Sequence, residues 1–85
     1  MVSSRHSRPL AAIFERPVRA DIRWAEIETL FRALGAEIEQ GAGSRVRVTL
    51  NGIHNVFHRP HPRPETDKGA VKAVRKFLID AGIRP

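Results

Sequence analysis

The sequence predicts an α+β fold in which a three-stranded antiparallel sheet carries helices on one face. Three observations support this class: an apolar stripe at helical spacing over residues 24–34, strict alternation on both sides of Asn51-Gly52, and a second helical stripe over 70–81. The order is α-β-β-β-α, preceded by a short N-terminal helix. Helices on one side of such a sheet leave the other side free to meet a ligand.

The N-terminal arm, residues 1–20, is expected to hold one short helix. Ser7 is a suitable N-cap, Pro9 would then lie in the first turn, and Pro17 would end the helix. Its apolar positions are Leu10, Ile13 and Phe14. Residues 21–85 form a single domain, because 85 residues leave no room for two cores.

The second helix is expected to begin at Asp21, whose carboxylate can cap it. Gly35 stands where a left-handed C-cap belongs. Residues 36–40 alternate and predict a short strand with Ile38 facing inward. The face of the helix expected to be buried comprises Trp24, Ile27, Leu30, Phe31 and Leu34.

The next two strands, residues 45–50 and 53–58, form a hairpin. Asn51-Gly52 is the strongest two-residue turn signal, because both positions of such a turn favour positive φ. The turn pairs Leu50 with Ile53, and this register assigns each side chain to one face. The core face carries Val46, Val48, Leu50, Ile53, Asn55 and Phe57. The free face carries Arg45, Arg47, Thr49, His54, Val56 and His58, with Arg45 directly opposite His58.

The last part of the chain combines a proline-rich loop with a helix. Residues 59–64 hold three prolines and cannot form a central strand or a helix interior. Residues 70–81 are expected to be helical, with Asp67 as N-cap and Gly82 as C-cap. The buried face of this helix comprises Val71, Val74, Phe77, Leu78 and Ala81.

The charge is unevenly distributed. Fifteen Lys and Arg against nine Asp and Glu give +6 overall. Residues 41–78 hold eight bases and two acids, whereas residues 21–40 hold two bases and five acids. A basic C-terminal half indicates a polyanionic partner, either a nucleic acid or an acidic protein. The candidate RNA-binding residues are Arg45, Arg47, His54, Arg59, Lys68, Lys72, Arg75 and Lys76.

A simpler interpretation of these charges stays open. Arg45 and Arg47 could pair with Glu37 and Glu39 on the neighbouring strand, and such exposed pairs contribute about 0–1 kcal/mol. The lysines of the last helix could serve solubility alone.

Composition and motifs exclude several classes of chemistry. The chain has no cysteine, and therefore no disulfide, thiolate metal site or cysteine nucleophile, and we expect it in a reducing cytoplasm. No apolar run approaches the ~20 residues of a membrane-spanning helix. His58 and His61 could approach each other, but no further ligands complete a tetrahedral set, so we expect no metal and no cofactor. No P-loop or dinucleotide fingerprint is present.

Five short pieces in order resemble the HicA toxins of bacterial toxin–antitoxin pairs. They are Leu34-Gly35, Gly43-Ser44-Arg45, Pro60-His61-Pro62, Lys68-Gly69 and Ala81-Gly82-Ile83. The resemblance runs from Trp24 to Ile83. It implies a double-stranded-RNA-binding-like fold, metal-independent cleavage of messenger RNA, and silencing by a HicB-like antitoxin protein.

One position departs from that family. Arg45 stands where the resemblance implies a catalytic histidine, and a guanidinium stays protonated and cannot act as a general base. Arg45 can instead hold a phosphate, while His58 across the hairpin moves protons, with His61 as second proton carrier. We therefore expect an endoribonuclease with catalytic residues His58, His61 and Arg45. The alternative is a catalytically silent module that binds RNA or the antitoxin.

Overall fold

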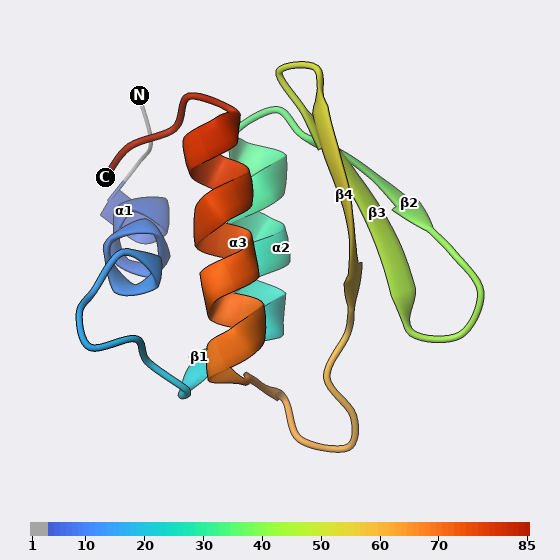
Figure 1. Cartoon of the computed structure of the whole chain (residues 1–85), viewed down its shortest axis with the longest axis horizontal. Coiled ribbons are helices and arrows are strands. Elements are labelled where there is room, and N and C mark those ends of the chain that lie inside the picture. Colours follow the sequence, from blue (N-terminus) through green and yellow to red (C-terminus); the bar gives the residue numbers. More distant parts are fainter. Residues whose placement is uncertain (1–3) are drawn as a thin grey trace.

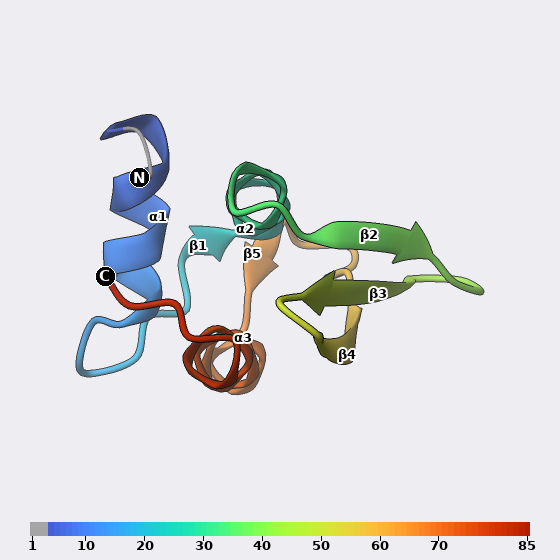
Figure 2. The same cartoon turned by 90° about the horizontal axis from the view of Figure 1, so that it is seen from above.

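The computed structural model describes residues 4–85, so residues 1–3 of the expected arm lie outside the described residues. The elements are α1 Ser4–Ile13, β1 Ile22–Arg23, α2 Trp24–Ala33, β2 Glu37–Gln40, β3 Arg45–Leu50, β4 Ile53–His58, β5 Glu65–Thr66 and α3 Lys68–Asp80. α2 and α3 lie side by side against one face of the sheet β2-β3-β4, and α1 packs on the far side of these two helices (Figures 1 and 2). The expected α+β fold, with helices on one sheet face, is confirmed.

The β3–β4 hairpin has the register that its turn predicts. Asn51 and Gly52 have φ values of 50° and 80°, and Leu50 pairs with Ile53. Strict alternation then turns Val46, Val48 and Phe57 toward the helices. Asn55 shares that side but is exposed, because β4 is an edge strand.

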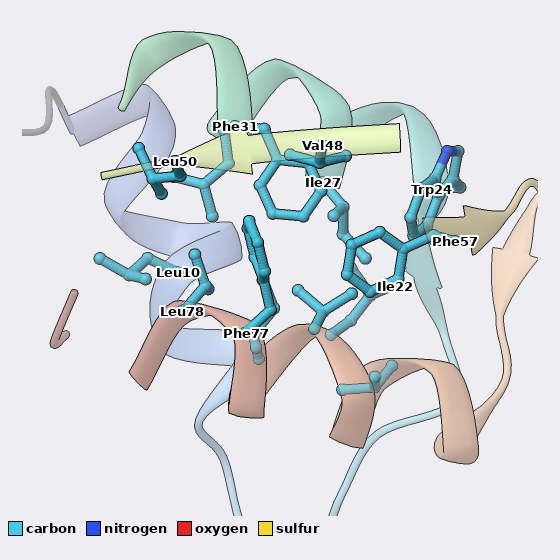
Figure 3. Packing of buried hydrophobic residues seen from close by; sticks show 14 of the residues in the cluster. Leu10, Ile22, Trp24, Ile27, Phe31, Val48, Leu50, Phe57, Phe77 and Leu78 are labelled. Atoms are coloured by element: carbon cyan, nitrogen blue, oxygen red, sulfur yellow. The ribbon is translucent and has the colours of Figure 1, made fainter. Parts of the chain in front are cut away.

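Four aromatic rings form the centre of the core. Phe57 of β4 stacks on Phe31 of α2 at 5.8 Å between ring centroids and meets Phe77 of α3 edge-on at 5.6 Å. Trp24 closes the group from the start of α2, 5.8 Å from Phe57 (Figure 3). Leu10 joins the same cluster from α1. The hairpin is therefore fixed to both central helices through one residue, Phe57, two positions before the proline-rich loop.

Three helix ends match their sequence signals, and one of them is the predicted C-cap of α3 at Gly82, which has φ +82°. Gly35 has φ +89°, and the amide of Ala36 donates to the Phe31 carbonyl at 2.9 Å, which ends α2 in the expected left-handed cap. Asp67 Oδ1 accepts the amide of Ala70 at 2.8 Å and caps α3.

Two expected helix starts are wrong. α1 begins at Ser4, so Pro9 lies inside the helix and Ser7 is not its N-cap. Burial of Leu10 and Ile13 against the central helices outweighs the intrahelical hydrogen bond that Pro9 removes. α2 begins at Trp24 and not near Asp21, whose carboxylate pairs with Arg19 at 2.7 Å.

The late start of α2 follows from a two-stranded ribbon that the sequence did not predict. Ile22 pairs with Thr66 and Arg23 with Glu65, which keeps the chain extended up to residue 23. The amide of Trp24 then donates to the Pro64 carbonyl at 3.0 Å. The ribbon thereby ties the chain before α2 to the end of the proline-rich loop.

Candidate nucleic-acid interface

Arg45 and His58 form the last pair of the β3–β4 hairpin on its free face. They are direct cross-strand partners, and both side chains are exposed. Among the described residues, neither side chain has a hydrogen-bond or ion-pair partner. In such a pair the guanidinium can hold a phosphate, and the imidazole beside it can transfer a proton to or from that phosphate.

The rest of the free face is arranged in rows across three strands. Arg47 lies between Glu39 of β2 and Val56 of β4, and Thr49 lies between Glu37 and His54. Val56 is 46 % exposed and adds an apolar side chain to this face. The face is therefore acidic along β2, basic along β3, and lined by two imidazoles and Val56 along β4.

Arg47 is opposite Glu39 in register, but no ion pair joins them within the part of the chain that the structure describes. The same holds for Arg45 and the glutamates of β2. The positive charge of β3 therefore remains available on the free face.

Arg59 is placed differently from the other candidate RNA-binding residues. Its Nε and Nη2 atoms donate to the two carboxylate oxygens of Glu28, at 2.6 and 3.1 Å. Its Nη1 donates to Gln40 Oε1, and its amide donates to the Ser44 carbonyl at 2.8 Å. The guanidinium is thus engaged inside the molecule.

Glu28 is a buried carboxylate on the apolar side of α2. It is 6 % exposed and also accepts Trp24 Nε1 and, at 3.3 Å, Arg32 Nη2. Burial raises the pKa of Glu28, but the hydrogen bonds from Arg59 and Trp24, with the charges of Arg59 and Arg32, outweigh burial and lower it overall. Glu28 is therefore ionised and paired.

Arg75 is also engaged inside the molecule. Its Nε donates to the Ile13 carbonyl and its Nη2 to the Glu15 carbonyl, both at 2.9 Å. Ile13 is the last residue of α1 and Glu15 follows it by two residues, so Arg75 joins α3 to the end of the N-terminal helix.

The three lysines of α3 form a row on its outward side. Lys68, Lys72 and Lys76 are exposed and follow each other at one helical turn, opposite the buried face of α3. Lys76 contacts Asp80 at 2.9 Å. The row is a second basic surface, separate from the Arg45–His58 pair.

His61 lies in the loop after β4, not in the cross-strand rows. It lines a cavity of about 290 Å³ together with Ala20, Pro60, Arg63, Glu65 and Asp67. Both basic and acidic groups border this cavity. The loop that carries His61 continues directly from the end of β4 (Figure 1).

Sequence reasoning missed Glu28 and Gln40. A signal was present for Glu28: it lies one turn after Trp24, on the same side of the helix as the apolar stripe. A carboxylate in that position needs a partner. Nothing local indicates that the partner is Arg59, which is 31 residues away.

Two further findings concern the described residues as a whole. No three His, Asp or Glu side chains among residues with described side chains gather in a group that could hold a metal ion. None of the described helices has the length and apolar character that crossing a bilayer requires.

Comparison with known proteins gives one match. The model of a family described as the HicA toxin of bacterial toxin–antitoxin systems matches residues 24–83, which cover more than half of the chain. No curated protein and no solved structure matches.

Proposed function

The chain belongs to the HicA family of toxins from bacterial toxin–antitoxin systems, and from this premise we propose that it binds and cleaves messenger RNA on the free face of its hairpin. Residues 4–23, with α1 and β1, precede the matched segment. They pack on the helices and the loop, away from the free face of the sheet (Figure 2).

One observation carries the proposal: Arg45 and His58 lie directly opposite each other on an exposed sheet face, with no internal partner among the described residues. Charged side chains that are not needed for the fold are free to contact a ligand. Arg47 and His54 extend the same face, and the lysine row of α3 can contact further phosphates of the same strand.

The proposed reaction is attack of an RNA 2′-hydroxyl on the adjacent phosphorus. A bond forms between the 2′-oxygen and phosphorus, and the bond from phosphorus to the 5′-oxygen of the next nucleotide breaks. One imidazole accepts the 2′-hydroxyl proton and another donates a proton to the leaving 5′-oxygen. The products are a cyclic 2′,3′-phosphate and a 5′-hydroxyl.

We assign the roles as follows. His58 acts in proton transfer, His61 is the second proton carrier, and Arg45, assisted by Arg47, holds the phosphate and stabilises its developing charge. No metal or cofactor is needed for these steps.

The proposed partner that silences the toxin is a HicB-like antitoxin covering the same face. The face offers such a protein an apolar contact at Val56, opposite Arg47 and between His54 and His58 along β4. The basic groups of β3 would speed association with an acidic partner.

The test is expression of wild type and of His58→Ala, with growth arrest and transcript cleavage as readouts. We expect His58→Ala to lose about 10²–10⁴-fold in cleavage rate. Its fold should stay intact, because the imidazole is exposed and unpaired. His54→Ala is the matched comparison and should reduce cleavage less, since Thr49 and not an arginine lies opposite His54.

Each outcome selects one interpretation. Cleavage that persists in EDTA, and growth restored by the antitoxin, would support the proposal. A folded His58→Ala variant that cleaves as fast as wild type would remove His58 from the mechanism. A wild type that binds RNA without cleaving it would establish the silent module, which the arginine at position 45 favours.

A further inference from the structure

We propose that Glu28 is the positioning residue of the Arg45–His58 pair, acting from the interior through Arg59 and Gln40. This inference deepens the proposed function and rests on it, because the residues that it positions are those proposed to act on RNA. Glu28 itself is buried and does not reach the free face.

The first link runs from Glu28 to His58. Arg59 directly follows His58, and its Nε and Nη2 atoms donate to the two carboxylate oxygens of Glu28, at 2.6 and 3.1 Å. A bidentate contact fixes the guanidinium plane as well as its distance. The position of the backbone after His58 is therefore fixed by the contact with α2 as well as by the pairing with β3.

The second link runs from Arg59 to Arg45. Arg59 Nη1 donates to Gln40 Oε1, and Gln40 Nε2 donates to the Gly43 carbonyl at 3.2 Å. The loop of Gly43 leads directly into Arg45. The Arg59 amide also donates to the Ser44 carbonyl at 2.8 Å. Both members of the Arg45–His58 pair are thus joined to one carboxylate.

The Glu28 carboxylate is itself held rigidly. Trp24 Nε1 and Arg59 Nε share its Oε2 atom, and Arg32 and Arg59 Nη2 share Oε1. Trp24 packs in the aromatic core beside Phe57. The pair is therefore connected to the buried aromatic core, and a fixed position of this kind is what proton transfer between aligned groups requires.

The experiment compares Glu28→Gln and Arg59→Lys with wild type. Glu28→Gln keeps the shape and removes the charge, and Arg59→Lys keeps the charge and removes the bidentate geometry. Glu26→Gln is the matched control, because Glu26 is exposed on the same helix and has no ion pair among the described residues. Two readouts are used: the NMR signals of the histidine rings in the free protein, and the kinetics of RNA cleavage.

We expect the His58 ring signals to shift in both test variants, with those of His54 unchanged and with no shift in Glu26→Gln. Misplacement of reacting groups lowers the rate of the chemical step, so kcat should fall about ten- to a hundredfold, while KM stays within about twofold. Unchanged His58 signals, or a raised KM with unchanged kcat, would overturn the proposal.

Two safeguards keep the test decisive. If Glu28→Gln does not fold, Gln40→Ala replaces it, because Gln40 is exposed. This substitution removes the side-chain contacts of the second link and leaves the Glu28–Arg59 contact in place. A shift of the Arg45 signals is then expected. If wild type cleaves no RNA, the proposed function fails, but the ring signals of the free protein still decide whether Glu28 positions the pair.

Discussion

Arg45 and Arg47 on β3 differ from Arg59 and Arg75 in what their guanidinium groups contact. The first two are exposed and have no ion-pair partner among the described residues. The other two are half-buried, and bind a buried carboxylate or the carbonyls that end α1. All four carry the same charge, so charge alone does not decide whether an arginine is free to contact a ligand. What matters is whether the fold already uses its donors.

Among the substitutions that test this difference between the arginines, Arg59→Ala should have the largest effect on the free energy of unfolding. Removal of Arg59 leaves the buried Glu28 carboxylate without its main partner. The free energy of unfolding should fall by about 3 kcal/mol, the lower end for a broken buried pair, because Arg59 is partly exposed to solvent. Denaturant titration measures the change. Arg47→Ala is the control, with an expected change within about 0.5 kcal/mol.

Arg75→Met should have the next largest effect. The substitution keeps the apolar stem and removes two charge-assisted hydrogen bonds to the end of α1. We expect a loss of about 2 kcal/mol in the free energy of unfolding and faster amide hydrogen exchange in α1. Lys72→Met on the outward side of α3 should change neither. Equal behaviour of the two variants would show that Arg75 is not a structural residue.

Acid should weaken the Glu28–Arg59 contact in a smaller and graded way. The pKa of Glu28 lies below its ordinary value of 4.5 in the folded state, so the folded state binds this proton more weakly than the unfolded chain. The contribution of this contact to the free energy of unfolding is complete above pH 4.5. It is lost as the pH falls through the lower pKa that Glu28 has in the folded state. The protonated carboxyl still accepts hydrogen bonds, which limits the loss. Denaturant titration across this pH range should show that acid lowers the free energy of unfolding less in Glu28→Gln than in Glu26→Gln.

The smallest effects are expected in RNA binding. Arg45→Gln and Arg47→Gln should each lower the slope of log affinity against log salt by about 0.7, the value for one phosphate of a single strand. Arg59→Gln and Arg75→Gln should leave that slope unchanged. A filter-binding series over several salt concentrations gives the slopes. A loss of slope in Arg59→Gln would place its guanidinium on RNA and break the comparison.

The sequence predicted the hairpin better than any other part of the molecule. Asn51-Gly52 fixes both the turn and the register, so the alternation of 45–50 and 53–58 assigns each side chain to its face. The same register places Arg45 opposite His58. The caps at Gly35 and Asp67 were predicted for a similar reason, because each depends on neighbours within one turn.

The remaining features depend on contacts between distant segments. β1 and β5 pair two residues each, too few for alternation to show. Glu28 meets Arg59 across 31 residues, and Arg75 meets Ile13 across 62. Such pairs leave no periodic pattern in the chain. The role of Arg59 and Arg75 in the fold could therefore be recognised only once the helices and the sheet were placed together.

The ribbon and the Glu28–Arg59 pair together hold both ends of the loop that carries His61. Trp24 binds the Pro64 carbonyl at one end, and Glu28 binds Arg59 at the other. Trp24 and Glu28 are one turn apart on α2, so a single rigid helix sets the spacing between the two ends of the loop. Fixing both ends removes conformational freedom from this loop when the chain folds. If RNA binds beside His61 as proposed, less entropy is left to lose at that step.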